Sequence, residues 1–127
     1  MVNYNSYLKS SDSLSFKEAT EIYEKMTTQM DMSDVDDAEL WNDLLNVIKE
    51  YSDYRFNWYG WDMQKRNEMD KSRSMCHDDV ITHFNMISRV QENQGKDNSW
   101  RKQLGDARKR IGDFACYIMY IVTINMR

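Results

Sequence analysis

The stretch "FACYIMYIVTI", residues 114–124, is the most apolar run of the chain and decides the fold class. It is too short to span a bilayer as a helix, and Asp113 stands directly before it. Apolar residues recur through this region at helical spacing: Ile111, Ala115, Ile118 and Val122. The stretch therefore predicts a buried helix in a protein without a membrane partner.

The rest of the chain also favours helices joined by few turns. It has no proline and only four glycines, whereas all-β domains depend on turn residues. A chain of 127 residues forms one ordinary domain. We predict an all-α protein: a polar N-terminal segment at residues 1–14, then a single four- to five-helix, mostly antiparallel bundle at residues 15–127. No secretory signal opens the chain, so Cys76 and Cys116 are expected as free thiols in the cytoplasm.

Local start and stop signals place the helices. Ser15 and Glu18, three residues later, have the form of a capping box. Ser33 or Asp34 suits the cap of the next helix. Gly95 suits a left-handed helix terminus. The predicted helices are 15–32, 34–64, 67–93 and 106–126, with a short turn of helix at 99–104.

Aromatic side chains gather in "YSDYRFNWYGW", residues 51–61, which holds six of the sixteen in the chain. Four of the six continue a heptad seam that begins earlier in the same predicted helix. Phe56 and Tyr59 lie on a different face, so three interpretations stay open: central burial, an oligomer or partner surface, and a ligand platform. We expect a homodimer. Its contact is predicted on one of two pairs, Phe56 with Tyr59 or Tyr117 with Tyr120.

Charge is distributed unevenly along the chain. Residues 1–64 carry five basic and thirteen acidic side chains, whereas residues 65–127 carry twelve basic and eight acidic ones. Either the two halves pack with complementary faces, or the second half offers a basic surface to an anionic partner. The net charge of −4 weakens non-specific attraction to phosphate, so nucleic acid is not the favoured partner.

Basic side chains cluster around Trp100 in one region: Lys96, Arg101, Lys102, Arg108, Lys109 and Arg110. One interpretation is a salt-bridged loop pinned by Trp100, in which Arg101 or Arg110 pairs with a nearby aspartate (Asp97, Asp106 or Asp113). The other interpretation is a binding site for an anionic ligand, such as a small nucleotide.

Two polar residues are predicted within apolar helix faces. Asp113 requires a cationic partner if it is buried, and Lys109 or Arg110, one turn earlier, could serve. Its surroundings fit a structural network or a small-molecule pocket. His77 lies on the same helical arc as Ile81, which predicts a hydrogen-bonded core or cap histidine and not a metal ligand.

Carboxylates supply the one candidate metal site. Their spacing resembles the acidic residues with which all-α nucleotide pyrophosphatases hold Mg²⁺, the residues here being Glu18, Glu21, Glu24 and Asp79. A solvated helix face is the other interpretation. The chain shows no nucleophile elbow, phosphate-binding loop or dinucleotide fingerprint. We therefore expect no catalytic residue and no cofactor, with the magnesium hydrolase kept as an alternative.

The C-terminal part contains a recognisable series of sequence motifs: "GKD-SWR", then "LGD", then "RKRIGDFACY", within residues 77–118. These motifs resemble a family of small proteins from low-GC Gram-positive bacteria and their phages. The family has no assigned activity, so no site residue is carried over. The resemblance implies a phage- or mobile-element-associated, intracellular and non-enzymatic interaction protein. Its expected partner is a host or phage protein, such as a component of a defence system.

Overall fold

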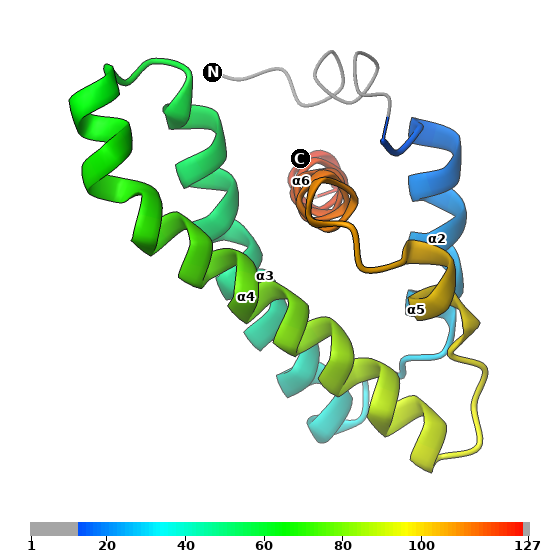
Figure 1. Cartoon of the computed structure of the whole chain (residues 1–127). Coiled ribbons are helices and arrows are strands. Elements are labelled where there is room, and N and C mark those ends of the chain that lie inside the picture. The colour runs from blue at the N-terminus through cyan, green and yellow to red at the C-terminus, as the bar shows by residue number, and fades with distance from the viewer. Residues whose placement is uncertain (1–12, 126–127) are drawn as a thin grey trace.

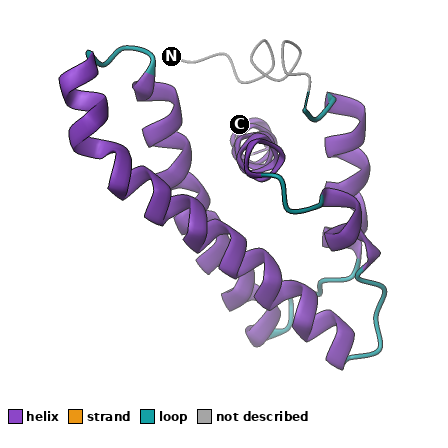
Figure 2. Cartoon of the chain, in the orientation of Figure 1, coloured by secondary structure: helices purple, strands orange, loops and turns teal. Residues whose placement is uncertain are grey.

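A computed structural model describes residues 13–125 of the chain, and within that range it contains helices and no strand (Figures 1 and 2). The predicted all-α bundle is confirmed. The helices are α2 (Phe16–Thr28), α3 (Val35–Trp58), α4 (Met63–Asn93), α5 (Ser99–Leu104) and α6 (Arg108–Asn125). Most of the predicted polar N-terminal segment lies outside the described residues. Leu14, its last member, is buried in the core.

The long helices α3 and α4 form an antiparallel hairpin, which is the most extensive helix pair in the fold. Helix α2, with the short α5 beside it, stands opposite the hairpin, and α6 runs between them and is seen nearly end-on in Figure 1. Residues 111–118 of α6 are all buried, so this helix has no solvent-facing side there. A helix that is buried all round needs neighbours on every side, which explains its central position.

Helix starts follow the predicted side-chain caps. Ser15 Oγ accepts a hydrogen bond from the Glu18 N–H, and Asp34 caps α3. The hairpin turn differs from the prediction, because Asp62 caps α4 at a point that the sequence pattern had placed inside a helix. Gly95 has the expected left-handed backbone, with φ of 71°.

The aromatic side chains of segment 51–61 differ widely in their burial. Tyr51 is buried and Phe56 is partly buried against the core, whereas Tyr59 is 67% exposed. Trp61 lies in the turn after α3, where its ring contacts that of Trp58. No helix in the described range is long and apolar enough to cross a membrane.

Candidate functional site

A pocket of about 400 Å³ opens between the second half of α3, the middle of α4 and the first turn of α6. It combines four cationic side chains with aromatic rings and a buried histidine. Its lining is Tyr51, Arg55, Trp58, Tyr59, Arg73, His77, Arg108 and Lys109. The pocket thus joins the aromatic segment of α3 to two residues of the basic cluster, Arg108 and Lys109.

One wall of the pocket is tied to a buried ion pair. Asp113 is fully buried on α6, and its Oδ1 lies 2.5 Å from Nη2 of Arg55 on α3. Ser13 donates a second hydrogen bond, from Oγ to Asp113 Oδ2. The prediction of a structural network at Asp113 is confirmed. Its cationic partner was predicted one turn back on the same helix, whereas the structure supplies Arg55 from the facing helix. Arg110, one of the two predicted partners, forms an ion pair with Glu18 instead.

Gly112 lets the side chains of Arg55 and Tyr51 lie close to the α6 backbone. A Cβ atom at Gly112 would lie less than 3.0 Å from Arg55 Nη1 and from Tyr51 Oη. Arg55 Nη1 also donates a hydrogen bond to Tyr51 Oη at 3.3 Å. The absence of a side chain at position 112 therefore makes room for both pocket residues.

His77 lines the pocket from α4 and is 2% exposed. Its Nε2 donates a hydrogen bond to the Arg108 carbonyl oxygen at 2.8 Å, which confirms the predicted hydrogen-bonded core histidine. In the neutral ring this bond makes Nδ1 an acceptor, and Nδ1 is buried with no partner among the described residues. Burial lowers the pKa of His77, and the neighbouring Arg108 and Arg55 charges act in the same direction. The imidazole is therefore neutral at pH 7.

The cationic side chains of the pocket have different surroundings. The Arg73 guanidinium lies over the Trp58 ring, 4.8 Å from its centroid. It also pairs with Asp70, while its Nε is buried without a partner among the described residues. Arg108 is more exposed and contacts Asp78 and Ser74 from the pocket rim. The guanidinium groups of Arg73 and Arg108 are thus held in place by contacts within the chain.

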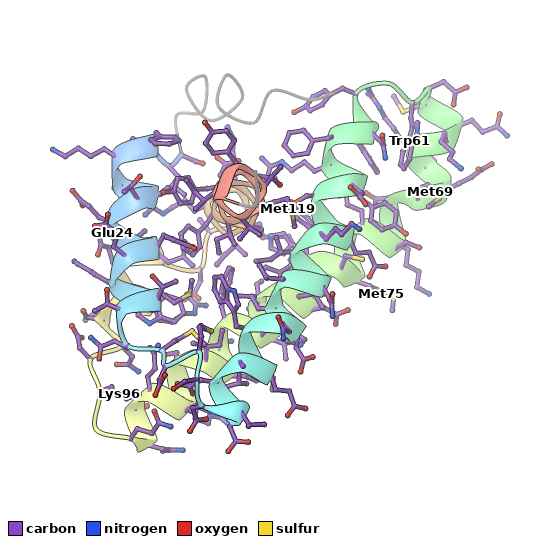
Figure 3. The ribbon with its side chains drawn as sticks, turned by 180° about the vertical axis from the view of Figure 1, so that it is seen from behind. Glu24, Trp61, Met69, Met75, Lys96 and Met119 are labelled. Atoms are coloured by element: carbon purple, nitrogen blue, oxygen red, sulfur yellow. The ribbon has the colours of Figure 1, made fainter. Side chains whose placement is uncertain are left out.

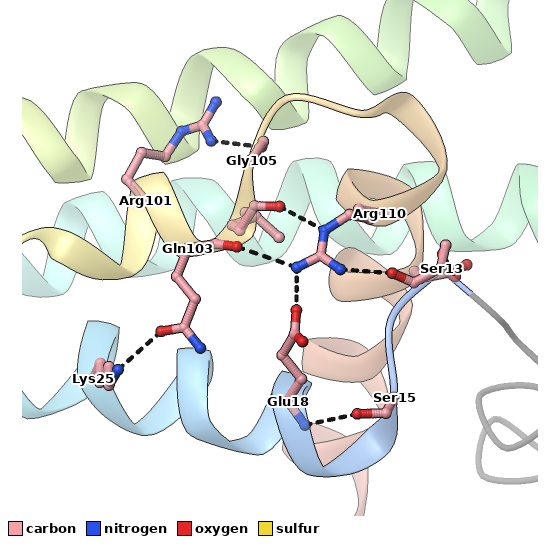
Figure 4. A network of polar contacts seen from close by, with 10 residues as sticks. Ser13, Ser15, Glu18, Lys25, Arg101, Gln103, Gly105 and Arg110 are labelled. Atoms are coloured by element: carbon pink, nitrogen blue, oxygen red, sulfur yellow. Dashed lines mark hydrogen bonds and ion pairs between the residues drawn. The ribbon is translucent and has the colours of Figure 1, made fainter.

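Trp100 pins the rest of the basic cluster to the bundle. It is 1% exposed, and its Nε1 donates to Gln91 Oε1 at 2.7 Å. Lys96 donates to the Gln29 carbonyl oxygen. Arg101 donates to the Gly105 carbonyl oxygen, as drawn in Figure 4.

Salt bridges complete the structural role of this region. Arg101 pairs with Asp106, as the salt-bridged interpretation predicted. Arg110 donates to the Ser13 carbonyl oxygen and pairs with Glu18 on α2 (Figure 4). Lys102 lines a separate pocket of about 450 Å³ beside Arg101 and Asp106. Lys96, Arg101 and Arg110 therefore stabilise the loop and its neighbours, whereas Arg108 and Lys109 line the α3–α4–α6 pocket.

The four carboxylates of the magnesium alternative do not converge. Glu18 pairs with Arg110, and Glu24 lies on the outer side of α2, away from the hairpin that carries Asp79 (Figure 3). No three His, Cys, Asp or Glu side chains within the described range form a group that could hold a metal ion. The predicted magnesium site is therefore wrong. Glu21 and Glu24 lie on an exposed face of α2, and no acidic group of a second helix in the described range meets them.

The predicted interaction surface at Tyr117 and Tyr120 is wrong for Tyr117. Tyr117 is 1% exposed and packs against Phe16 and Tyr23 of α2, and its hydroxyl meets that of Thr20. It belongs to the core because α2 covers this face of α6. Tyr120, one turn later, is partly buried against Phe16.

Both cysteines are free and buried, as expected for unpaired thiols. Desolvation raises the pKa of Cys76 to about 12, and it raises that of Cys116 to about 12 as well. The thiolate, which is the reactive form, is therefore scarce at neutral pH.

Comparisons with protein-family models, with curated proteins and with solved structures gave no significant match. The resemblance of residues 77–118 to a phage-associated family stays a prediction. Sequence reasoning missed Arg55 and Arg73 as site residues. A usable signal was present: Tyr51 with Arg55, and Arg73 with His77, are spaced four apart, so each pair shares a helix face.

Proposed function

We propose that this chain is a non-enzymatic binding protein whose pocket between α3, α4 and α6 takes an anionic ligand. The observation that carries the proposal is the meeting of Arg55, Arg73, Arg108 and Lys109, from three helices, in one pocket. Convergent cationic side chains raise the local potential for an anion, and arginine matches phosphate or carboxylate oxygens with two donors.

Hydrogen bonding is incomplete at two side chains that line the pocket. Buried polar groups in proteins nearly always have a hydrogen-bond partner, so each exception calls for an explanation. Two of the exceptions among the described residues, His77 Nδ1 and Arg73 Nε, belong to side chains that line this pocket. Both atoms are buried beneath the pocket surface, so a ligand reaches them only if these side chains shift.

Binding is favoured over catalysis by the chemistry of the lining. The pocket wall offers guanidinium and ammonium groups, phenol and indole rings, and one imidazole. The imidazole Nε2 is already bonded to the Arg108 carbonyl oxygen. No carboxylate, thiol or aliphatic hydroxyl is among these lining side chains, so serine, threonine and cysteine nucleophiles and carboxylate bases are missing from the wall.

Isothermal titration calorimetry of the full chain tests anion binding directly. The panel is inorganic phosphate, pyrophosphate, ribose 5-phosphate, nucleoside monophosphates and a short acidic peptide. We expect at least one anion to bind, with an affinity that falls as salt rises. Lys109→Ala should weaken that binding, because Lys109 lines the pocket.

Lys102→Ala is the matched control, since Lys102 is an exposed lysine that lines a different pocket. Binding that survives Lys102→Ala and is weakened by Lys109→Ala supports the proposed site. The proposal fails if no anion in the panel binds, or if Lys102→Ala weakens binding as much as Lys109→Ala.

A second candidate function is the expected interaction with a host or phage protein, in the cytoplasm that the resemblance implies. The observation that favours it is the α3–α4 turn, where Tyr59 and Met63 are each 67% exposed. Large exposed apolar side chains that lie together are typical of contact surfaces. The same turn would be the contact of the predicted homodimer.

Affinity capture from the native host, with wild type and Met63→Ser in parallel, tests this candidate. A protein retained by the wild type and lost with Met63→Ser supports it, whereas equal retention by both contradicts it. Light scattering at tens of micromolar separates the homodimer, which doubles the 15.3 kDa mass of the chain.

A further inference from the structure

A pocket with acidic and aromatic lining lies between the second half of α3, the α3–α4 turn and the start of α4. Its volume is about 270 Å³, and its lining is Glu50, Asp53, Tyr54, Asn57, Trp61 and Met69. We propose that this pocket takes an arginine side chain from a basic segment of another protein, while the acidic face of α3 binds the flanking cations. The site shares no residue with the anion pocket and goes beyond the function proposed above.

The exposed positions of α3, a helix that the structure describes in full, carry mostly negative charge. Side chains three and four positions apart share a helix face. Five carboxylates follow this spacing at exposed positions: Asp36, Glu39, Asp43, Glu50 and Asp53. Asn46 and Asn57 fill further positions of the same row, and Lys49 is the one basic side chain at an exposed position of the helix. The row therefore forms a continuous polar face with a net negative charge.

These carboxylates lack cationic partners within the chain. No ion pair among residues 13–125 involves any of the five. Glu50 accepts a hydrogen bond from the Cys76 thiol, and a carboxylate can accept about four. Like charges one turn apart on a helix repel one another, so a cationic partner that binds here also relieves repulsion. Charge complementarity thus selects a basic ligand.

The pocket adds a place for one particular kind of cation. Glu50 and Asp53 line it beside Tyr54, and no basic side chain is among its lining residues. A guanidinium group is planar, donates to two carboxylate oxygens at once and stacks on aromatic rings. A lysine ammonium is a compact point charge that gains less from such a wall. The mixed lining therefore fits arginine better than lysine.

Trp61 forms the far wall and is partly occupied within the chain. Its ring stands at 82° to that of Tyr54, with the centroids 6.4 Å apart. The Lys65 ammonium lies over the Trp61 ring, 5.5 Å from its centroid, and Lys65 is not one of the lining residues. An arginine in the pocket would therefore depend on the carboxylates and on the Tyr54 ring, and not on the Trp61 face that Lys65 covers.

The length of the acidic face favours a polypeptide over a small cation. Asp36 and Glu50 are fourteen positions apart, which is about 21 Å along a helix. An extended segment of about seven residues covers that distance, whereas one small ammonium ion cannot reach both ends. A basic segment with an arginine in the pocket can thus use the whole row.

Fluorescence anisotropy with the full chain tests the kind of ligand. The probes are labelled nona-arginine and nona-lysine peptides, at low and at physiological salt. We expect nona-arginine to bind about fivefold or more tightly than nona-lysine. The affinity should fall as salt rises. Equal binding of the two peptides would show that charge alone attracts them and would overturn the arginine site.

Two matched variants locate the site. Glu50→Gln removes one charge from the pocket. Glu24→Gln makes the same chemical change on α2, on the opposite side of the molecule from Trp61 and Met69 (Figure 3). Both glutamates are exposed, so both variants should fold, which a circular-dichroism melt checks. Glu50→Gln should weaken nona-arginine about fivefold or more, and Glu24→Gln less than about twofold.

Asp53→Asn is the second pocket variant and guards against an effect of Glu50→Gln that comes from its contact with Cys76. It should weaken nona-arginine as Glu50→Gln does. The inference is wrong if nona-arginine does not bind at low salt, if Glu24→Gln weakens it as much as Glu50→Gln, or if Asp53→Asn has no effect. The anion titrations decide the proposed function separately, because phosphate and acidic probes have no attraction to this acidic face.

Discussion

Gly112→Ala is the substitution that tests the pocket wall most directly. In most helix interiors alanine is more stable than glycine by about 1 kcal/mol. At this position the new methyl group would lie less than 3.0 Å from Arg55 Nη1 and Tyr51 Oη, so both side chains would have to move. Neither moves freely, because Arg55 is held by the buried Asp113 and Tyr51 is 3% exposed.

The size of the effect follows from the ion pair. Separating Arg55 from Asp113 leaves a carboxylate that is fully buried, and breaking a buried pair costs about 3–5 kcal/mol. The gain in helix propensity offsets about 1 kcal/mol of this. We therefore expect Gly112→Ala to lower the free energy of unfolding by about 2–4 kcal/mol. A glycine-to-alanine change in a helix interior usually raises the free energy of unfolding, so the expected effect here has the opposite sign.

Urea unfolding followed by circular dichroism at 222 nm measures the difference. Gly60→Ala is the control, because a Cβ there meets only the Asn57 carbonyl oxygen, at an ordinary 3.6 Å. It should stay within about 1 kcal/mol of wild type. In a Tyr51→Phe, Arg55→Ala background the two closest atoms are gone, and Gly112→Ala should then cost far less. A Gly112→Ala variant as stable as Gly60→Ala would refute the reasoning.

Three further predictions concern the core. Trp100→Phe should destabilise the fold by about 1–3 kcal/mol in urea unfolding, because it leaves the buried Gln91 Oε1 without its donor; an unchanged midpoint would contradict this. Cys76 and Cys116, whose pKa values are raised to about 12, should resist a chromogenic thiol reagent at pH 8 until urea unfolds the chain, and fast labelling of the folded protein would show otherwise. Because burial lowers the pKa of His77 below its ordinary 6.5, the unfolded chain takes up this proton first, so the contribution of His77 to stability is full above pH 6.5 and is lost as the pH falls toward its folded-state pKa. Unfolding at pH 7.5, 6.5 and 5.5 should therefore show a steeper acid loss for wild type than for His77→Gln, and parallel curves would count against a neutral buried imidazole.

The sequence by itself determined the fold class and most helix positions. Helical periodicity, side-chain caps such as Ser15 and Asp34, and the left-handed turn at Gly95 depend on residues within about four positions of one another, so they can be recognised along the chain. The burial of Trp100 and the salt-bridged character of its loop followed in the same way, because cations and aspartates alternate over a short segment.

Only the tertiary structure decided the candidate site. Asp113 was expected to pair one turn back on its own helix, and its partner is Arg55, 58 positions earlier in the chain. Which side chains face one another across α3, α4 and α6 depends on how α6 is surrounded by its neighbours. The packing of the whole core sets that arrangement, and no local pattern encodes it. The unsatisfied nitrogen of His77 is a product of the same packing, because the turn of α6 that carries Arg108 occupies the other nitrogen of the ring.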